Sequence, residues 1–461
     1  MSMTLRLLSS AIAFGAMAVA TNASAFCGFY VAKADTDLFN QSSKVAMMRD
    51  GDRTVITMAN DYEGEPEEFA IVIPVPTIIT KDQVHVSDPA LLAHLDVYTA
   101  PRLVEYFDDN PCNRMQYETE MRVFRALPQA VSETVEDAAE ALGVTIEEEF
   151  TVGEYDILIL SAKESDGLQT WLEQNGYKVP EKAKQTLSSY IKQDMKFFVA
   201  KVNLEARADS GNEYLRPIAV AFESPKFMLP IRLGTVNAQG NQDMFVYMLT
   251  RGGQVETTNY RTQKIPTDQE IPPYVKDEFG DFYKSMFHTA AERDGGHGVF
   301  MEYAWDMNWC DPCAADPMSD EQLQELGVFW LDNGATDIPQ PQPRIRPRPQ
   351  SKDVFVTRLH VRYDAESFPE DLKFKTTGNR DNFQGRYVMR HAYDGEMVCE
   401  AAADYKKQVN ARRETEINTL ANLTGWTRKN IRKKVEDDTG FFTMDDSAPK
   451  HRWWSKLWGS E

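Results

Sequence analysis

The first 25 residues constrain the fold most, because they indicate where the rest of the chain folds. A basic start, MSMTLR, precedes the apolar run LLSSAIAFGAMAVA and the small residues ASA at positions 23–25. This pattern predicts a secretory signal peptide over residues 1–25. An uncleaved anchor is the weaker alternative, because the run is shorter than the roughly 20 apolar residues of a membrane-spanning helix. We therefore expect residues 26–461 to be periplasmic or secreted, without a transmembrane segment.

Five cysteines follow this leader, and an exported chain meets oxidising conditions in which disulfides form. They are Cys27, Cys112, Cys310, Cys313 and Cys399. The odd count allows about 15 ways to make two bridges and leave one thiol. A bridge from Cys27 to Cys112 is the natural candidate for the N-terminal part. Cys399 is then free, or it pairs with Cys310 or Cys313.

The segment NWCDPCAADP, at 308–317, resembles a thiol–disulfide exchange site, because a Trp precedes a Cys-x-x-Cys pair that contains Pro. A redox-active pair has its first thiol at the N-terminus of a long helix, which lowers the thiol pKa. Here the next helix is predicted to begin only at Ser319, where Gln322 completes a capping box, and to end by Gly327. The pair therefore lies in a loop, which favours a structural disulfide over a redox pair and over a zinc site.

The pattern of apolar residues predicts an α+β fold. Two strand-like runs flank a hairpin turn at Asp50-Gly51, and a helix is predicted after Asp88, with Pro89 at its first position. Pro74 and Pro76 should end a buried strand or place it at an edge. We expect a β-rich core of mostly antiparallel strands with helices packed on one face, plus a helical C-terminal segment.

Changes in composition divide the chain into predicted segments. These are the signal peptide (1–25), a β-rich α+β unit (26–265), a mixed segment with the Cys-x-x-Cys pair (266–336), a proline-rich linker or loop (337–352), returning strands (353–403) and a helical, basic and aromatic tail (404–461). The tail carries Trp453, Trp454 and Trp458 beside cations. That composition is typical of weak contact with a membrane surface, although we favour a tail that folds back onto the acidic body or is disordered.

The charge of the chain excludes one class of partner. It has 50 Lys and Arg against 71 Asp and Glu, a formal net charge of −21. So acidic a protein is repelled by nucleic acid, and we expect no nucleic-acid partner. The identity of any other partner stays open.

Catalytic motifs are mostly missing from the sequence. It contains no G-x-S-x-G, no H-E-x-x-H and no phosphate-binding G-x-x-x-x-G-K-[ST]. Ser189 and Lys192 have S-x-x-K spacing, which one chance match explains. Acidic runs at 63–68 and 146–150 are interpreted as solvated, and the loop-like set Asp35, Asp37 and Asn40 lacks the EF-hand pattern for calcium. We predict no catalytic residue, no metal and no cofactor.

Several segments, in order, resemble the bacterial domain-of-unknown-function 2330 family. They include FCGFYVAKADTDLFNQ, LDVYTAPRLVEYFDDNPC, VGEYDILILSA, MEYAWDMNWCDPCAADPMSDEQLQELG and VFVTRLHVRYD, and the likeness runs from about Cys27 to about Tyr393. The resemblance implies an exported protein with cysteines in these places. The family has no established reaction, so it implies no catalytic residues.

These observations predict an exported protein, periplasmic or secreted, that is a non-catalytic binding or structural component of the bacterial envelope, stabilised by disulfides. The alternative is a thiol–disulfide oxidoreductase that uses Cys310 and Cys313. A hydrolase whose site is assembled from distant residues is a weaker third possibility.

Overall fold

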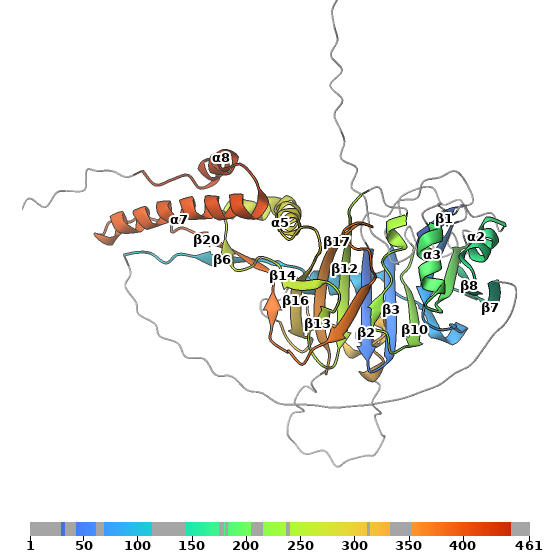
Figure 1. Ribbon diagram of the computed structural model, residues 1–461. Helices are drawn as coiled ribbons and strands as arrows, with labels where there is room; N and C mark the ends of the chain where they lie inside the picture. The colour runs from blue at the N-terminus through green and yellow to red at the C-terminus, as the bar shows by residue number, and fades with distance from the viewer. Residues whose placement is uncertain are drawn as a thin grey trace, which may run out of the picture.

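The computed structural model describes residues 29–32, 43–60, 69–112, 144–174, 179, 183–203, 215–236, 240–310, 314–331 and 352–443. Their strands form two large sheets and two small ones, with the helices on the outside (Figure 1). In spatial order, the five-stranded sheet contains β1 (Phe29–Ala32), β4 (Phe69–Val75), β9 (Lys196–Val202), β8 (Tyr155–Ala162) and β7 (Val144–Val152). The nine-stranded sheet contains β14 (Arg261–Lys264), β16 (Gly298–Asp306), β17 (Phe355–Tyr363), β12 (Gln242–Thr250), β2 (Ser43–Asp50), β3 (Arg53–Asn60), β10 (Ile218–Glu223) and β5 (Val84–Val86), with β19 (Phe383–Gln384) paired to β16.

The small sheets each have three strands. One contains β11 (Met228–Leu229), β18 (Leu372–Thr376) and β13 (Val255–Thr257), and the other β15 (Gln269–Glu270), β20 (Arg386–His391) and β6 (Arg102–Phe107). The helices are α1 (Pro89–Thr99), α2 (Ser165–Gln174), α3 (Ala183–Ile191), α5 (Phe279–Arg293), α6 (Asp320–Leu326), α7 (Ala401–Thr424) and α8 (Arg428–Asp438). Four short 3-10 turns are η1 (Lys81–Gln83), η2 (Gly234–Val236), η3 (Pro273–Glu278) and η4 (Phe329–Leu331).

The main core lies between the two large sheets. Ile73 of β4 and Ile157 of β8 belong to the same buried cluster as Met58 of β3 and Val246 of β12. The opposite face of the five-stranded sheet is covered by α2 and α3, and that of the nine-stranded sheet by α1 and α6. Strand β4 is therefore buried on both faces, which explains why its sequence is continuously apolar instead of alternating. The predicted α+β fold with mostly antiparallel strands and a helical C-terminal segment is confirmed.

Local signals in the sequence predicted several elements correctly. The β2–β3 hairpin turns after Asp50, and Gly51 has a φ of +56°, a conformation that glycine adopts without strain. In α1, the Asp88 side chain accepts a hydrogen bond from the Ala90 amide, and proline occupies the first turn. In α6, Ser319 and Gln322 form the expected capping box.

Pro74 lies inside β4, beyond the part of the strand whose pairing with β1 is described. Pro74 pairs with Phe197 of β9, whereas the described pairing of β4 with β1 ends at Val72. Among the described residues, the missing amide of proline therefore removes no hydrogen bond between β4 and β1.

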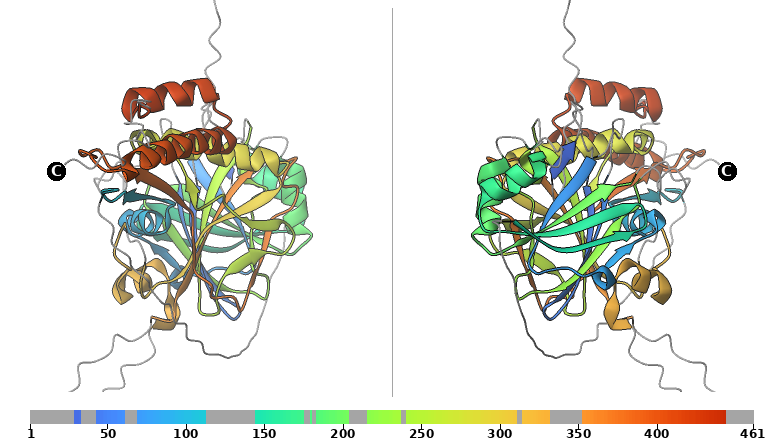
Figure 2. Two further views of the ribbon diagram at one scale, coloured as in Figure 1. Left: turned by 90° about the vertical axis from the view of Figure 1, so that its left-hand side faces the viewer. Right: turned by 90° about the vertical axis from the view of Figure 1, so that its right-hand side faces the viewer.

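The C-terminal part forms a separate layer of helices above the end of the nine-stranded sheet (Figures 1 and 2). Helix α7 packs against α5 and α8, and Ile417 of α7, Met286 of α5 and Ile431 of α8 share the main core. No helix in the described part of the chain is long and apolar enough to cross a membrane. Most of the proline-rich segment and the tryptophans of the tail lie outside the described residues.

One disulfide joins Cys112, just after β6, to Cys399, just before α7. The expected bridge between Cys27 and Cys112 is therefore wrong. The pairing follows from the parallel contact of β6 with β20, which brings the ends of two distant segments together. The sulfurs connect positions 287 residues apart in sequence.

Candidate functional site

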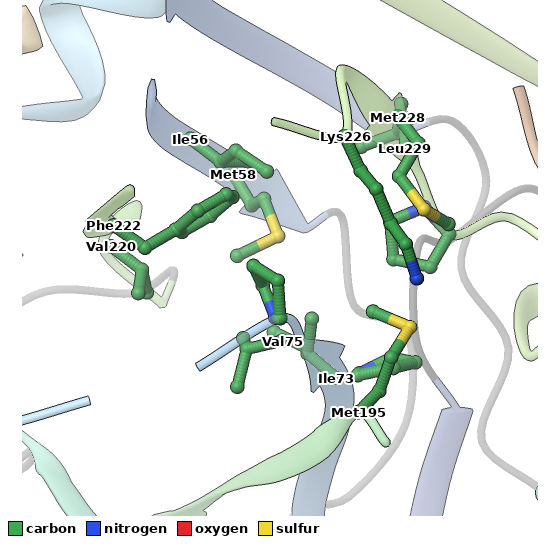
Figure 3. A pocket seen from close by; sticks show the side chains of 13 residues that line it. Ile56, Met58, Ile73, Val75, Met195, Val220, Phe222, Lys226, Met228 and Leu229 are labelled. Carbon is green, nitrogen blue, oxygen red and sulfur yellow. The ribbon is translucent and has the colours of Figure 1, made fainter. Parts of the chain in front are cut away.

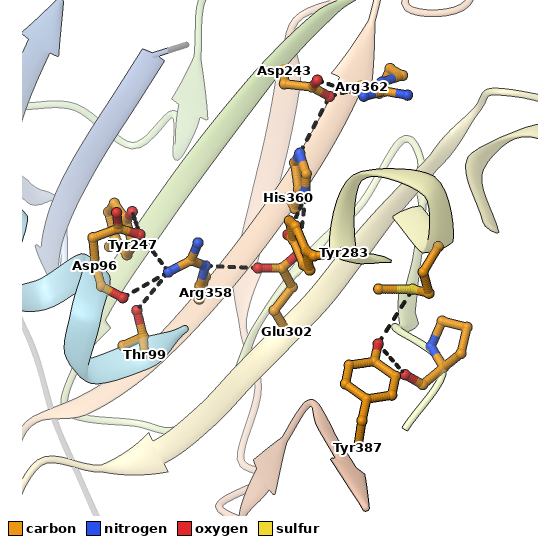
Figure 4. A network of polar contacts seen from close by, with 12 residues as sticks. Asp96, Thr99, Asp243, Tyr247, Tyr283, Glu302, Arg358, His360, Arg362 and Tyr387 are labelled. Atoms are coloured by element: carbon orange, nitrogen blue, oxygen red, sulfur yellow. Dashed lines mark hydrogen bonds and ion pairs between the residues drawn. The ribbon is translucent and has the colours of Figure 1, made fainter. Parts of the chain in front are cut away.

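A buried network of charged side chains crosses the nine-stranded sheet (Figure 4). Strand β17 contributes Arg358, His360 and Arg362, which share one face because successive side chains of a strand alternate. The register between β16 and β17 shifts between Met301 and Tyr303, so Glu302 is the extra residue of a bulge. Bulges of this kind redirect a side chain, and here Glu302 points to the cations of β17.

Arg358 is the centre of one half of the network. Its Nε lies 2.7 Å from Oε2 of Glu302, and its Nη1 lies 2.6 Å from Oδ1 of Asp96, on α1. The side chains of Arg358 and Glu302 are 5% and 0% exposed. Asp96 also pairs with Lys44 on β2 and accepts a hydrogen bond from the Tyr247 hydroxyl. Through these contacts Asp96 ties α1 to three strands of the sheet, β17, β2 and β12.

His360 is the centre of the other half. Its Nδ1 lies 3.0 Å from Oε1 of Glu302, and its Nε2 lies 3.3 Å from Oδ1 of Asp243. The Tyr283 hydroxyl donates to Glu302, and the Phe287 ring stacks on the imidazole at 3.5 Å between centroids. Both aromatic residues belong to α5, so this half of the network fastens that helix to the sheet.

The charges of the network compensate each other. Burial would lower the pKa of His360, but Glu302 and Asp243 outweigh that effect and raise it. Burial would likewise raise the pKa of Glu302, but Arg358 and His360 hold it below its usual value. Both shifts therefore favour the charged forms of His360 and Glu302. Because Glu302 and His360 are inaccessible to a substrate, the arrangement is structural, and a catalytic role would require the sheet to open.

An apolar pocket lies between the two large sheets (Figure 3). It is lined from β3, β4, β10 and the segments around β11 and before β9, by Ile56, Met58, Ile73, Pro74, Val75, Pro76, Met195, Val220, Phe222, Lys226, Met228, Leu229 and Pro230. The empty space among them, including the part open to solvent, is about 490 Å³. The enclosed cavity itself is only about 20 Å³, so a small-molecule ligand can enter only if the lining side chains move aside. We call it the inter-sheet pocket.

Lys226 is the one charged residue among those that line the inter-sheet pocket. Its side chain extends past Met228 toward Met195 (Figure 3). Within the described residues it forms no ion pair. Met58, Met195 and Met228 are unbranched and adaptable, so they can change rotamer to admit a ligand.

The Cys-x-x-Cys segment follows β16 directly. Cys310 takes part in a disulfide, and Cys27 and Cys313 lie outside the described residues. Trp309 is half-exposed and stacks edge-on with Trp305 at 4.9 Å between centroids. Helix α6 begins at Asp320, well after the cysteines, as the capping signal predicted. Cys310 is thus not at a helix N-terminus, the position that lowers the thiol pKa in exchange enzymes.

The remaining sequence candidates are not brought together in the structure. Ser189 donates to the Thr186 carbonyl and accepts from Arg232, so its hydroxyl is not activated by Lys192. The acidic run 146–150 belongs to β7, the last strand of its sheet. Asp35, Asp37 and Asn40 and the acidic run 63–68 lie outside the described residues. In the part described, no three His, Cys, Asp or Glu side chains are grouped to hold a metal ion.

Sequence reasoning missed both the ionic network and the inter-sheet pocket. The sequence predicted returning strands over 353–403, which include VFVTRLHVRYD of β17, but it did not predict ion pairs between these strands. The sequence did contain one signal for the network: Arg358, His360 and Arg362 lie on one face of a strand whose other residues are mostly apolar. The pocket had no such signal, because its lining comes from five separate segments.

Glu416 of α7 is also a buried acidic residue, at 2% exposed. Unlike Glu302, it has only one long ion-pair contact among the described residues. Its Oε1 lies 3.5 Å from Nε of Arg412. Burial raises the pKa of Glu416 to about 7, an effect that Arg412 only partly offsets.

This pKa predicts how stability depends on pH. Below the pKa of an unfolded glutamate, near 4.5, the carboxyl is protonated in both states. As pH rises toward about 7, the unfolded state ionises first, so folding stability falls by up to about 3 kcal/mol. We expect Glu416→Gln to raise the free energy of unfolding in urea at pH 8 and to leave it unchanged at pH 4. Glu414→Gln removes a half-exposed carboxylate of α7 that pairs with Arg432 of α8; it is the control and should change stability by no more than about 1 kcal/mol at either pH. Equal effects of the two variants would contradict the assignment.

The architecture first defines a class: an α+β protein of two packed β-sheets with helices outside them. Within that class, the chain belongs to DUF2330, a family of uncharacterised proteins conserved in bacteria, whose family model matches residues 21–375. The resemblance found in the sequence is thereby confirmed. Neither a curated protein nor a solved structure matches the chain.

Proposed function

We propose that this protein is exported to the bacterial cell envelope and binds a ligand there without converting it chemically. The leader pattern of residues 1–25 and the disulfides support export. The observation that carries binding is the inter-sheet pocket, in which apolar side chains surround a single cation.

The chemistry of the pocket defines the class of ligand. Isoleucine, valine, methionine and phenylalanine side chains offer dispersion contacts and exclude water from an apolar chain. The ammonium of Lys226 offers charge pairing at one point of the lining. The best match is an amphiphile with an apolar chain and an anionic head group, such as a fatty acid.

A fluorescent fatty acid, dansyl-undecanoate, tests this proposal. We expect saturable binding by the intact protein, and binding weakened about tenfold or more by Met228→Trp, because the indole occupies space at the pocket. Val97→Trp, which adds the same ring at a half-exposed position of α1, should leave the affinity unchanged. Competition with unlabelled decanoate separates specific binding from adsorption of the dye.

The role of Lys226 needs its own comparison. Lys226→Gln should weaken binding of dansyl-undecanoate and leave the corresponding uncharged alcohol unaffected. No saturable binding, or binding equally insensitive to Met228→Trp and Val97→Trp, would refute the pocket as the ligand site.

A further inference from the structure

A second cavity lies beside α3, on the helix-covered side of the five-stranded sheet, and its lining is unusual for so acidic a protein. Ser165, Lys184, Gln185, Ser188, Ser189, Lys192 and Arg232 line an open cavity of about 530 Å³. None of these residues is acidic, although the chain has a net charge of −21. We call this cavity the α3 cationic pocket.

The helix periodicity explains why these groups converge. Lys184, Ser188 and Lys192 are spaced four residues apart, so they follow one stripe of α3 and its last turn. Arg232 reaches the same stripe from the segment after β11, and its Nη1 donates to Oγ of Ser189 at 2.7 Å. Its guanidinium also lies 5.9 Å from the centre of the Tyr190 ring, which helps to hold it in place.

Two cations of the pocket, Lys192 and Arg232, are not neutralised by described carboxylates. Neither Lys192 nor Arg232 has a described carboxylate oxygen within 4.0 Å, the distance of an ion pair. The nearby Asp194 pairs instead with Lys196 at 2.8 Å. Asp371 accepts hydrogen bonds from the Tyr190 hydroxyl and from the backbone amide of Arg232, and it does not pair with the guanidinium.

We propose that the α3 cationic pocket binds an oxyanion of the phosphate type. A guanidinium fork, an ammonium and the Ser188 hydroxyl come from different elements, and a tetrahedral anion can accept hydrogen bonds from all of them. Ser165 stands at the first turn of α2, whose backbone amides and dipole add favourable potential for an anion. The Ser189 hydroxyl is already engaged on both sides, so this site binds and does not transfer a phosphoryl group.

The site is independent of the inter-sheet pocket, and calorimetric titration of the full chain tests it. Inorganic phosphate and glycerol phosphate should bind saturably at low salt, and affinity should fall as salt increases. Lys192→Gln should weaken binding about tenfold, the loss expected for one charge-assisted hydrogen bond. Lys433→Gln, which removes an exposed cation of α8, is the matched control and should change nothing.

Two additional measurements identify the source of the anion and separate a loss of binding from a loss of the fold. Sedimentation with phosphatidylglycerol vesicles, compared with phosphatidylcholine vesicles, shows whether the ligand is a lipid head group. Arg232→Lys keeps the charge and removes the fork, so weaker phosphate binding by a folded variant supports the geometry. The proposal fails if neither soluble phosphate nor phosphatidylglycerol binds, or if Lys192→Gln and Lys433→Gln behave alike.

Discussion

Replacement of Arg358 by methionine is expected to destabilise the protein by about 3–5 kcal/mol, the usual cost of removing one partner from a buried ion pair. The substitution leaves Glu302, which is fully buried, with only His360 as a basic partner, and it removes one of the two described ion-pair partners of Asp96, the other being Lys44. Methionine fills much of the space of the arginine stem, so the loss reports mainly the uncompensated charge. Urea unfolding at pH 7 measures it.

The same substitution at an exposed pair provides the control. Arg53 of β3 pairs with Glu223 of β10 at 2.8 Å, but the two side chains are 69% and 60% exposed. Arg53→Met should therefore cost under about 1 kcal/mol. If the two variants lose the same stability, the network does not hold the sheet together as inferred.

A double variant separates the ion pair from its surroundings. The double variant Arg358→Met/Glu302→Gln removes both charges of the pair, so neither is left buried without the other. The combined loss of stability should therefore be smaller than the sum of the two single losses. Additive losses would show that Arg358 and Glu302 do not depend on each other.

Loss of the Cys112–Cys399 bridge is the second large effect. The bridge closes a loop of 287 residues, and removing a native disulfide typically costs about 2–5 kcal/mol, with the larger values for long loops. We expect Cys112→Ser and Cys399→Ser each to lower the free energy of unfolding by about 3–5 kcal/mol. The helical C-terminal layer should be affected first, because the bridge anchors the start of α7 to β6.

Pairing and stability can be checked on the same samples. The double variant should lose no more stability than either single variant, since all three lack the same bond. A non-reducing peptide map should recover the peptides of Cys112 and Cys399 as one linked species. A linked pair of Cys27 and Cys112, or a loss under about 1 kcal/mol in the single variants, would contradict the structure.

The sequence predicted features that depend on a few neighbouring residues. The turn at Gly51, the cap of α1 by Asp88 and the capping box of Ser319 are each decided within four residues, so local chemistry was enough. The same holds for the short helix after the Cys-x-x-Cys pair, whose late start argued against a redox site.

Long-range pairings could not be predicted in this way. β17 follows more than 100 residues after β12 in the chain, yet it lies between β12 and β16 and presents its cations to a bulge in β16. Nothing within β17 indicates that Glu302 will meet Arg358, because that contact depends on a register shift in another strand. The inter-sheet pocket has the same origin, since it exists only after two sheets have packed.

By itself, the sequence determined the family, the class of fold, the leader pattern and the local turns and caps of this protein. Only the tertiary structure decided that Cys112 pairs with Cys399, that Arg358 and His360 of one strand are buried, and that apolar and cationic pockets form at different sides of the five-stranded sheet. The physical reason is the range of the interactions. Backbone conformation depends on adjacent residues, whereas the pairing of strands and of side chains depends on how entire sheets bury their faces.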